Sequence, residues 1–225
     1  MKVGPANHMK LTPTHIQTAR RHLRAADPVM KAIIDAVGPY TLRFERDRFA
    51  MLVRSIVSQQ ISTSAARAIR RRLQELAGPG GLTAANLARF GTDELRSVGL
   101  SPQKASYVAD LACKVNDGTM DLRQIGRLTD ERVVEMLTQV KGIGRWTAQM
   151  FLIFSLGRPD VFPHEDLGVR TAIRDRYGLA DLPDKATSYA IATPWRPYAS
   201  VASWYCWRSL DLARNTETVA KGYPS

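Results

Sequence analysis

The stretch LTQVKGIGRWTA, residues 137–148, decides how this chain folds. It reads as the end of an amphipathic helix, a tight turn in which two glycines flank one aliphatic residue, and the start of a second helix. Glycines at 142 and 144 let the backbone turn without a Cβ clash. The helical pattern continues through Met150, Ile153 and Phe154 as far as Gly157. The segment 137–157 therefore predicts a hairpin of two helices.

The composition favours a polyanionic partner. The 225 residues include 32 Lys and Arg against 21 Asp and Glu, which gives a formal net charge of +11. A charge of this size favours nucleic acid first and an anionic membrane surface second. Because no apolar run approaches the roughly 20 residues that span a bilayer, we expect no membrane association. We expect a soluble protein of the cytoplasm, associated with the nucleoid if the source is bacterial.

Ligands for a catalytic metal or an iron-sulfur cluster are lacking in the sequence. The four histidines, which show no metal-ligand spacing, are His8, His15, His22 and His164. The two cysteines, Cys113 and Cys206, fall short of the four thiolates that an iron-sulfur cluster needs. We therefore expect no cofactor in catalysis. The His8-Met9 step resembles a cloning remnant, so residues 1–8 are left out of the fold prediction.

The rest of the chain predicts an all-α fold. Helical periodicity runs through nearly every segment, and helix starts are marked by capping residues at Asp47, Thr92, Ser101 and Thr129. The helix around residues 65–73 carries Arg67, Arg70, Arg71 and Arg72, which either contact phosphates or form an ordinary solvated face. We predict two helical subdomains, one of residues 45–160 and one of residues 1–44 with 161–225, and an active cleft between them.

The hairpin turn has the chemistry of a phosphate site. Backbone amides at the start of its second helix are unpaired within the helix, and the helix dipole attracts an anion there. Many similar turns serve only to pack two helices together. With the basic composition, the turn predicts contacts to the DNA backbone by Lys141, Gly142, Ile143, Gly144, Arg145 and Thr147. Such contacts position a protein without reading bases.

The combined motifs resemble a known family. The segments VKGIGRWTA (140–148) and RPDVFPHEDLG (158–168) are similar to the hairpin and the following loop of the helix-hairpin-helix (HhH-GPD) DNA glycosylases. The alkylation-repair branch, 3-methyladenine DNA glycosylase II, is the most similar branch. The resemblance extends from about residue 48 to 170, and returns in residues 194–198 and 204–205. It implies excision of alkylated purines from double-stranded DNA in base excision repair, by a monomer that lacks an N-terminal β-domain.

The resemblance assigns the catalytic carboxylate to Asp166. Departure of the base builds positive charge on the sugar, and a fixed carboxylate stabilises that state and orients the attacking water. Asp166 could instead merely cap the helix that begins at Leu167, and Asp160 and Glu165 are nearby competitors for the catalytic role.

The residue at one position of the hairpin leads us to expect hydrolysis without strand cleavage. Family members that also cut the strand carry a lysine two residues after the second hairpin glycine, where this chain has Trp146. Without that amine the covalent lyase reaction lacks its nucleophile. Lys104 and Lys141 are conceivable substitutes, although neither matches the family position. A bifunctional glycosylase/lyase for oxidised bases and a noncatalytic DNA-binding protein are the alternative functions.

The resemblance also implies a base pocket, a wedge and an ion. Aromatic walls favour a cationic alkylated base over a normal one, although buried aromatics more often only pack the core. The implied pocket residues are Gln59, Trp146, Met150, Trp204 and Tyr205, and the wedge that fills the gap left by the flipped base is Gln60 and Ile61. Met150 stands where well-known bacterial relatives have tyrosine. The backbone carbonyls of Thr138, Val140 and Ile143 are expected to bind a structural Na+ or K+ ion.

Overall fold

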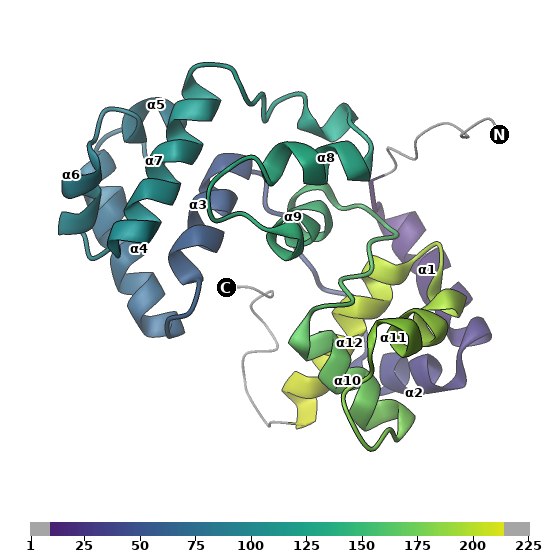
Figure 1. The fold of residues 1–225 in the computed structure, drawn as a ribbon. Helices are drawn as coiled ribbons and strands as arrows, with labels where there is room; N and C mark the ends of the chain where they lie inside the picture. The colour runs from purple at the N-terminus through teal and green to yellow at the C-terminus, as the bar shows by residue number, and fades with distance from the viewer. Residues whose placement is uncertain (1–9, 214–225) are drawn as a thin grey trace. The chain divides into compact units, whose positions relative to one another are not determined.

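The computed structural model describes residues 10–213, so the predicted remnant at residues 1–8 lies outside the described residues. Every element of regular structure in this part of the chain is a helix, which confirms the all-α prediction (Figure 1). Within the same residues, no helix combines the length and the apolar character needed to cross a bilayer. The described residues form two compact units, unit 1 from Glu45 to Phe151 and unit 2 from residues 10–44 and 152–213.

Unit 1 is built around a central helix against which shorter helices pack. Helix α7 packs against three other helices of the unit, α3, α5 and α6. Helix α3 also contacts α4 and α9, and α8 packs against α9. The helices are α3 (Arg48–Ser58), α4 (Thr63–Ala77), α5 (Ala84–Leu87), α6 (Thr92–Ser97), α7 (Pro102–Asn116), α8 (Asp130–Leu137) and α9 (Arg145–Phe151), with a 3-10 turn at Ile125–Arg127.

Short polar side chains start the helices of unit 1 at the predicted positions. Asp47 accepts a hydrogen bond from the Ala50 amide at 2.9 Å, and Ser101 and Thr129 cap α7 and α8 in the same way. Helix α6 differs, because its cap is Gly91, whose amide donates to the Glu94 carboxylate at 2.9 Å. The capping signals therefore locate these helices to within one residue.

Unit 2 surrounds the last helix of the chain. Helix α12 is buried from Ala199 to Leu210, and it packs against α1, α2 and α10. Burial on nearly all sides explains why its sequence is apolar or small around the whole helix rather than along one stripe. The helices are α1 (Pro13–Ala26), α2 (Pro28–Val37), α10 (Leu167–Tyr177), α11 (Lys185–Ala192) and α12 (Ala199–Ala213), with a 3-10 turn at Thr193–Trp195.

A buried carboxylate holds the N-terminal helices in unit 2. Asp27 is 5% exposed and caps α2 by accepting the amides of Val29 and Met30 at 2.8 and 3.0 Å. Its other oxygen accepts hydrogen bonds from the Trp195 indole at 2.9 Å and from the Tyr177 hydroxyl. Burial, followed by this hydrogen bond to Asp27, raises the pKa of Tyr177, so the phenol stays protonated.

The second helix of the hairpin departs from the predicted continuous α-helix. It is α-helical only to Phe151, and Leu152–Leu156 forms a π-helical turn. The amide of Arg158 bonds to the carbonyl of Leu152 at 2.9 Å, and Gly157 ends the helix with a φ of +65°. The apolar pattern predicted a helix here correctly, but it carries no information on whether the turn is α or π.

Candidate active site and DNA interface

The hairpin turn presents some of its predicted DNA-contacting residues to solvent and buries others. Lys141, Gly144 and Arg145 are exposed, whereas Ile143 is 4% exposed and Thr147 is 5% exposed. Ile143 therefore packs the turn onto the unit, and its amide donates to the Val140 carbonyl at 3.1 Å. The buried side chain of Thr147 leaves the exposed members of the turn as the chemical groups that a phosphate can reach.

The first hairpin glycine is required by two independent features. Gly142 has a φ of +78°, a conformation that costs an L side chain free energy. A Cβ atom on Gly142 would also lie 2.0 Å from Cδ2 of Tyr107, inside the ring. Gly144 has neither restriction, since a Cβ atom there would meet nothing within 4 Å. The two glycines of the turn therefore have different roles.

The predicted wedge segment lies against the hairpin. The Gln59 side-chain amide donates to the Gly142 carbonyl at 2.8 Å, which joins the end of α3 to the hairpin turn. The next residue, Gln60, is exposed and has a φ of +54°, and it is the one non-glycine residue with positive φ among residues 10–213. Ile61 follows with 38% of its surface exposed. An apolar side chain displayed on a strained turn suits insertion into a base stack.

Lys104 supports the same segment. Its ammonium donates to the carbonyls of Val57 and Gln59 at 2.8 and 2.5 Å, and so satisfies the C-terminal end of α3. Partial burial lowers the pKa of Lys104. The Lys104 ammonium is thus held by backbone carbonyls directly before the wedge residues.

Asp110 is a supporting residue that the sequence did not reveal. Its carboxylate accepts the Lys141 amide of the hairpin turn at 3.0 Å and pairs with Lys114 at 2.5 Å. Burial raises the pKa of Asp110, but the hydrogen bonds from Lys114 and the Lys141 amide outweigh this effect and lower it. Tyr107 and Asp110 both lie on α7, three residues apart, so one face of that helix supports the turn.

The two predicted pocket residues on α9 differ in exposure. Trp146 is 39% exposed at the start of the helix, whereas Met150, one turn later, is 2% exposed. Trp146 thus has a ring surface that a base or a sugar can contact. Met150 contributes to the packing of unit 1.

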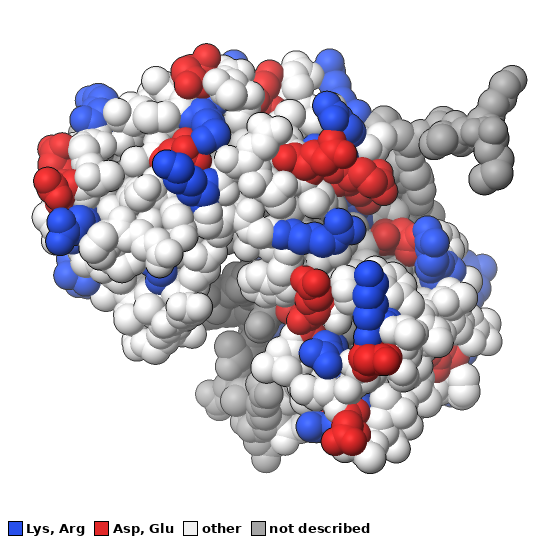
Figure 2. All heavy atoms as spheres, viewed as in Figure 1, with Lys and Arg blue, Asp and Glu red and all other residues white. Residues whose placement is uncertain are grey.

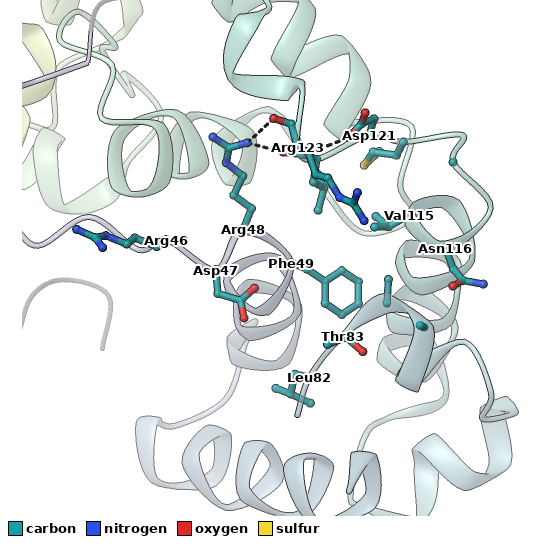
Figure 3. Close-up of a pocket in the computed structure, with 15 residues that line it drawn as sticks. Arg46, Asp47, Arg48, Phe49, Leu82, Thr83, Val115, Asn116, Asp121 and Arg123 are labelled. Carbon is teal, nitrogen blue, oxygen red and sulfur yellow. Dashed lines mark hydrogen bonds between the residues drawn. The ribbon is translucent and has the colours of Figure 1, made fainter. Parts of the chain in front are cut away.

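A separate pocket occupies the opposite end of α3 from the wedge (Figure 3). It encloses about 890 Å³ at the first residues of α3, and none of the predicted site residues lines it. The Phe49 ring and the Arg123 side chain extend toward it, while the Arg48 guanidinium donates to the Leu122 carbonyl at 2.6 Å. The base pocket predicted around Gln59 is therefore a different site.

Asp166 is a buried carboxylate at the start of α10 in unit 2. It is 4% exposed, and one oxygen accepts both the Val169 amide and the Trp207 indole N–H at 2.8 Å. The first bond is the helix cap that the sequence offered as the alternative role of Asp166. The second bond has no part in capping and fixes the orientation of the carboxylate.

Trp207 is the second functional candidate that the sequence did not reveal. Its indole stacks on the Phe154 ring, with centroids 5.4 Å apart and an interplanar angle of 29°. A Cβ atom on Gly168 would lie 2.9 Å from Cδ1 of Trp207 and 3.1 Å from the Asp166 carboxylate. Gly168 therefore allows the indole to reach Asp166, which explains a glycine in the first turn of a helix.

The two competing carboxylates of the same loop have different surroundings. Asp160 pairs with Arg196 at 2.8 Å and accepts the Ala199 amide at 3.3 Å, so it anchors the loop to the start of α12. The side chain of Glu165 is 58% exposed. Asp166 alone among the three is buried and bonded to an indole, which favours it as the preorganised group.

Trp204 and Tyr205 are buried in unit 2. The Trp204 ring lies 4.4 Å from the Tyr40 ring and 4.9 Å from the Tyr205 ring, centroid to centroid. The Tyr205 hydroxyl donates to the Gly38 carbonyl at 3.0 Å, and the Arg208 guanidinium lies 5.7 Å from the Trp204 ring centroid. These contacts are those of a packed aromatic cluster, the alternative role that the sequence left open for both residues.

The distribution of charge does not by itself locate a DNA interface. On the face drawn in Figure 2, Lys and Arg are interspersed with Asp and Glu rather than gathered into one basic patch. Within residues 10–213, no group of three or more His, Cys, Asp or Glu side chains is arranged to hold a metal ion.

Comparison with known proteins identifies the family. DNA-3-methyladenine glycosylase 1 of Schizosaccharomyces pombe is 32% identical over 92% of this chain and 92% of its own. A solved S. pombe 3-methyladenine DNA glycosylase in complex with abasic DNA has a TM-score of 0.79 at 32% identity, covering 89% of this chain and 100% of that one. DNA-3-methyladenine glycosidase of Bacillus halodurans has the same TM-score and identity, covering 89% of this chain and 93% of that one. Residues 53–197 match the model of the HhH-GPD superfamily of base excision DNA repair proteins, and the chain belongs to that family.

Proposed function

We propose that this protein is a DNA glycosylase that flips alkylated purines of the 3-methyladenine type out of duplex DNA and hydrolyses their N-glycosidic bond. The S. pombe and B. halodurans relatives carry the name of that activity, and one was solved with abasic DNA, the product of base release. The single observation that carries the proposal is the buried Asp166 carboxylate held by the Trp207 indole.

Asp166 supplies the electrostatic part of the reaction. As the bond to the base lengthens, positive charge develops on the sugar, and the buried carboxylate stabilises it without reorganising at the moment of reaction. Alkylation of a ring nitrogen already makes the base a better leaving group, so a modest stabilisation is sufficient. Water completes the reaction by attacking the sugar carbon, and the departing base carries the bonding electrons away.

Unit 1 places the duplex for this reaction. The exposed turn around Gly144 offers backbone amides to a phosphate of the damaged strand, with Lys141 and Arg145 beside it. Gln60 and Ile61 take the place of the flipped nucleotide. The exposed Trp146 ring offers a π-face to a cationic base. We propose that the protein does this as a monomer.

Strand cleavage by a lysine is not expected of this protein. Trp146 occupies the position of the lyase lysine, and the Lys104 ammonium is engaged by the Val57 and Gln59 carbonyls. Base release should therefore leave an intact abasic strand.

A monovalent cation fits the chemistry of the hairpin carbonyls. The carbonyl oxygens of Thr138, Val140 and Ile143 are neutral, hard donors of the kind that Na+ and K+ prefer. The Val140 carbonyl already accepts the Ile143 amide, and its second lone pair remains for an ion. An ion held there would supply positive charge beside the hairpin turn.

The test compares two variants of the same loop. Asp166→Asn keeps an oxygen acceptor for the Val169 amide and so keeps the helix cap, whereas Asp160→Asn alters a carboxylate of the same loop that lies outside the proposed chemistry. With a duplex containing 3-methyladenine or ethenoadenine, we expect Asp166→Asn to slow base release about 100- to 1,000-fold and Asp160→Asn to slow it much less.

Base release and strand cleavage are scored separately in this experiment, with a duplex containing an oxidised purine as a third substrate. Undiminished base release by Asp166→Asn refutes the role of that carboxylate. Strand cleavage without added alkali supports the bifunctional alternative, and no release from any duplex supports a noncatalytic DNA-binding protein.

A further inference from the structure

Helices α3 and α4 pack against each other, and both carry arginines. Arg54 on α3 forms an ion pair with Glu45, and Arg67 and Arg70 lie three residues apart on α4. Burial lowers the pKa of Arg70, and the positive charges of Arg54 and Arg67 lower it further, while Glu45 acts in the opposite direction. We call Arg54, Glu45, Arg67 and Arg70 the α3–α4 arginine cluster.

The cluster has an excess of positive charge. The cluster holds three guanidinium groups and one carboxylate, and Glu45 already accepts hydrogen bonds from Arg54 and from the Asp47 amide. In the part of the chain that the structure describes, no carboxylate lies within ion-pair distance of Arg67 or Arg70. Like charges held this close are unfavourable without a counterion. The remaining charge is available to an anionic ligand.

The cluster is accessible to a ligand. Arg67 is exposed, and Arg54 and Arg70 are half-buried. The buried face of α4 consists of Ala66, Ile69, Leu73 and Ala77. At 100° per residue, Arg70 borders that face on the side of α3 and Arg67 projects beyond it.

The position of the cluster relative to the wedge identifies the ligand. Helix α4 is capped by Ser62, directly after Gln60 and Ile61. A rise of 1.5 Å per residue places Arg67 and Arg70 about 8 to 12 Å along α4 from its cap. Along a duplex that rises 3.4 Å per base pair, this distance covers at most about four base pairs. A duplex entered by the wedge thus has backbone phosphates within reach of the cluster.

We propose that the α3–α4 arginine cluster binds backbone phosphates of duplex DNA within about four base pairs of the flipped nucleotide, as a second phosphate site in addition to the hairpin. Planar guanidinium groups bind phosphate through two parallel hydrogen bonds. Such contacts hold the register of the duplex on both sides of the wedge and do not read bases. The proposal rests on the proposed DNA glycosylase function, because it takes the wedge at Gln60 and Ile61 as the point of entry.

The test removes two charges from the cluster and two elsewhere in unit 1. The variant is Arg67→Gln with Arg70→Gln, and the control is Arg72→Gln with Arg96→Gln. Arg72 lies beside Gly99, on another side of α4, and Arg96 pairs with Asp93 on α6. Both double variants lose the same charge, so a general effect of net charge is common to them.

Affinity for a duplex with a central tetrahydrofuran abasic analogue is measured by fluorescence anisotropy between 50 and 300 mM NaCl. Loss of two phosphate contacts should reduce the slope of log K against log salt by about 2, and the control should reduce it by clearly less. In the cluster variant alone, phosphate ethylation interference should disappear at positions within about four base pairs of the lesion.

Equal slopes for the cluster variant and the control, or unchanged ethylation interference, would overturn the proposal and leave the arginines as a solvated helix face. Tighter binding of polyglutamate than of duplex through the same two arginines would overturn it in favour of an acidic protein partner. If the unaltered protein binds the duplex but releases no base, the proposed glycosylase function is wrong. The salt slopes of the cluster variant and the control then still show whether the arginines bind phosphate.

Discussion

Replacing Gly142 by alanine tests whether the hairpin turn is fixed by its backbone and by Tyr107 together. A φ of +78° costs an alanine about 1–2 kcal/mol relative to glycine. The new Cβ would lie 2.0 Å from Cδ2 and 2.6 Å from Cγ of Tyr107. Because Cγ is the atom that joins the ring to the rest of the side chain, the whole ring has to move. Overpacking of this kind costs about 1–3 kcal/mol. The free energy of unfolding should therefore fall by about 2–5 kcal/mol.

Urea unfolding of the full chain, followed by tryptophan fluorescence, measures this loss. At a slope of about 2 kcal/mol per molar urea, the midpoint should fall by about 1–2.5 M. Gly144→Ala is the matched control, because its Cβ meets nothing within 4 Å and its φ is not positive. Its unfolding free energy should change by less than about 1 kcal/mol.

A double-mutant cycle separates the two contributions. In a Tyr107→Ala background the ring is absent, so Gly142→Ala should cost only the backbone part, about 1–2 kcal/mol. The same cost with and without the Tyr107 ring would refute the steric part of the reasoning. An unfolding free energy for Gly142→Ala equal to that of the unaltered protein would refute both parts.

Three further predictions concern single side chains. Lys104→Met removes the ammonium that binds the last carbonyls of α3. The free energy of unfolding in urea should therefore fall by about 1–3 kcal/mol. An unchanged free energy of unfolding would contradict the capping role. Because the pKa of Asp110 is lowered in the folded protein, its contribution to stability is present above the unfolded pKa near 4 and is lost as the pH falls through the lower folded pKa. Asp110→Asn should therefore lower stability at pH 7 and flatten the acid limb of the stability curve below pH 4, and a limb as steep as before would count against this. Trp207→Phe keeps a ring but removes the indole donor to Asp166, so single-turnover base release should slow about tenfold; an unaltered rate would show that this hydrogen bond does not position the carboxylate.

Local signals in the sequence were sufficient to locate most of the helices. Asp47, Ser101 and Thr129 each begin a helix where predicted, because capping depends on a side chain and an amide only three residues away. The hairpin turn was also recognisable, since two glycines around one buried aliphatic residue form a local pattern.

Residues that act through distant contacts were not recognisable. Asp110, one helical turn after Tyr107, bonds to a turn 31 residues later in the chain, and Trp207 reaches Asp166 across 41 residues. Nothing in the spacing of these residues marks the contact. Gly168 was the available signal, because glycine in the first turn of a helix usually indicates the close approach of another group.

The surroundings of the predicted pocket residues were not recognisable from the sequence. Met150 is buried in unit 1, and Trp204 and Tyr205 lie in a packed cluster of unit 2 with Tyr40. The exposed aromatic among the predicted pocket residues is Trp146. The burial of the others depends on packing between elements far apart in the chain, which helical periodicity does not report.

The double engagement of Asp166 affects how this position changes in evolution. The same oxygen that is bonded to the Trp207 indole also caps α10 through the Val169 amide. A lineage that gives up base excision still needs a short acceptor to begin that helix, so selection for folding alone retains aspartate, asparagine or serine there. Aspartate at this position in a related gene is therefore weak proof of a working enzyme.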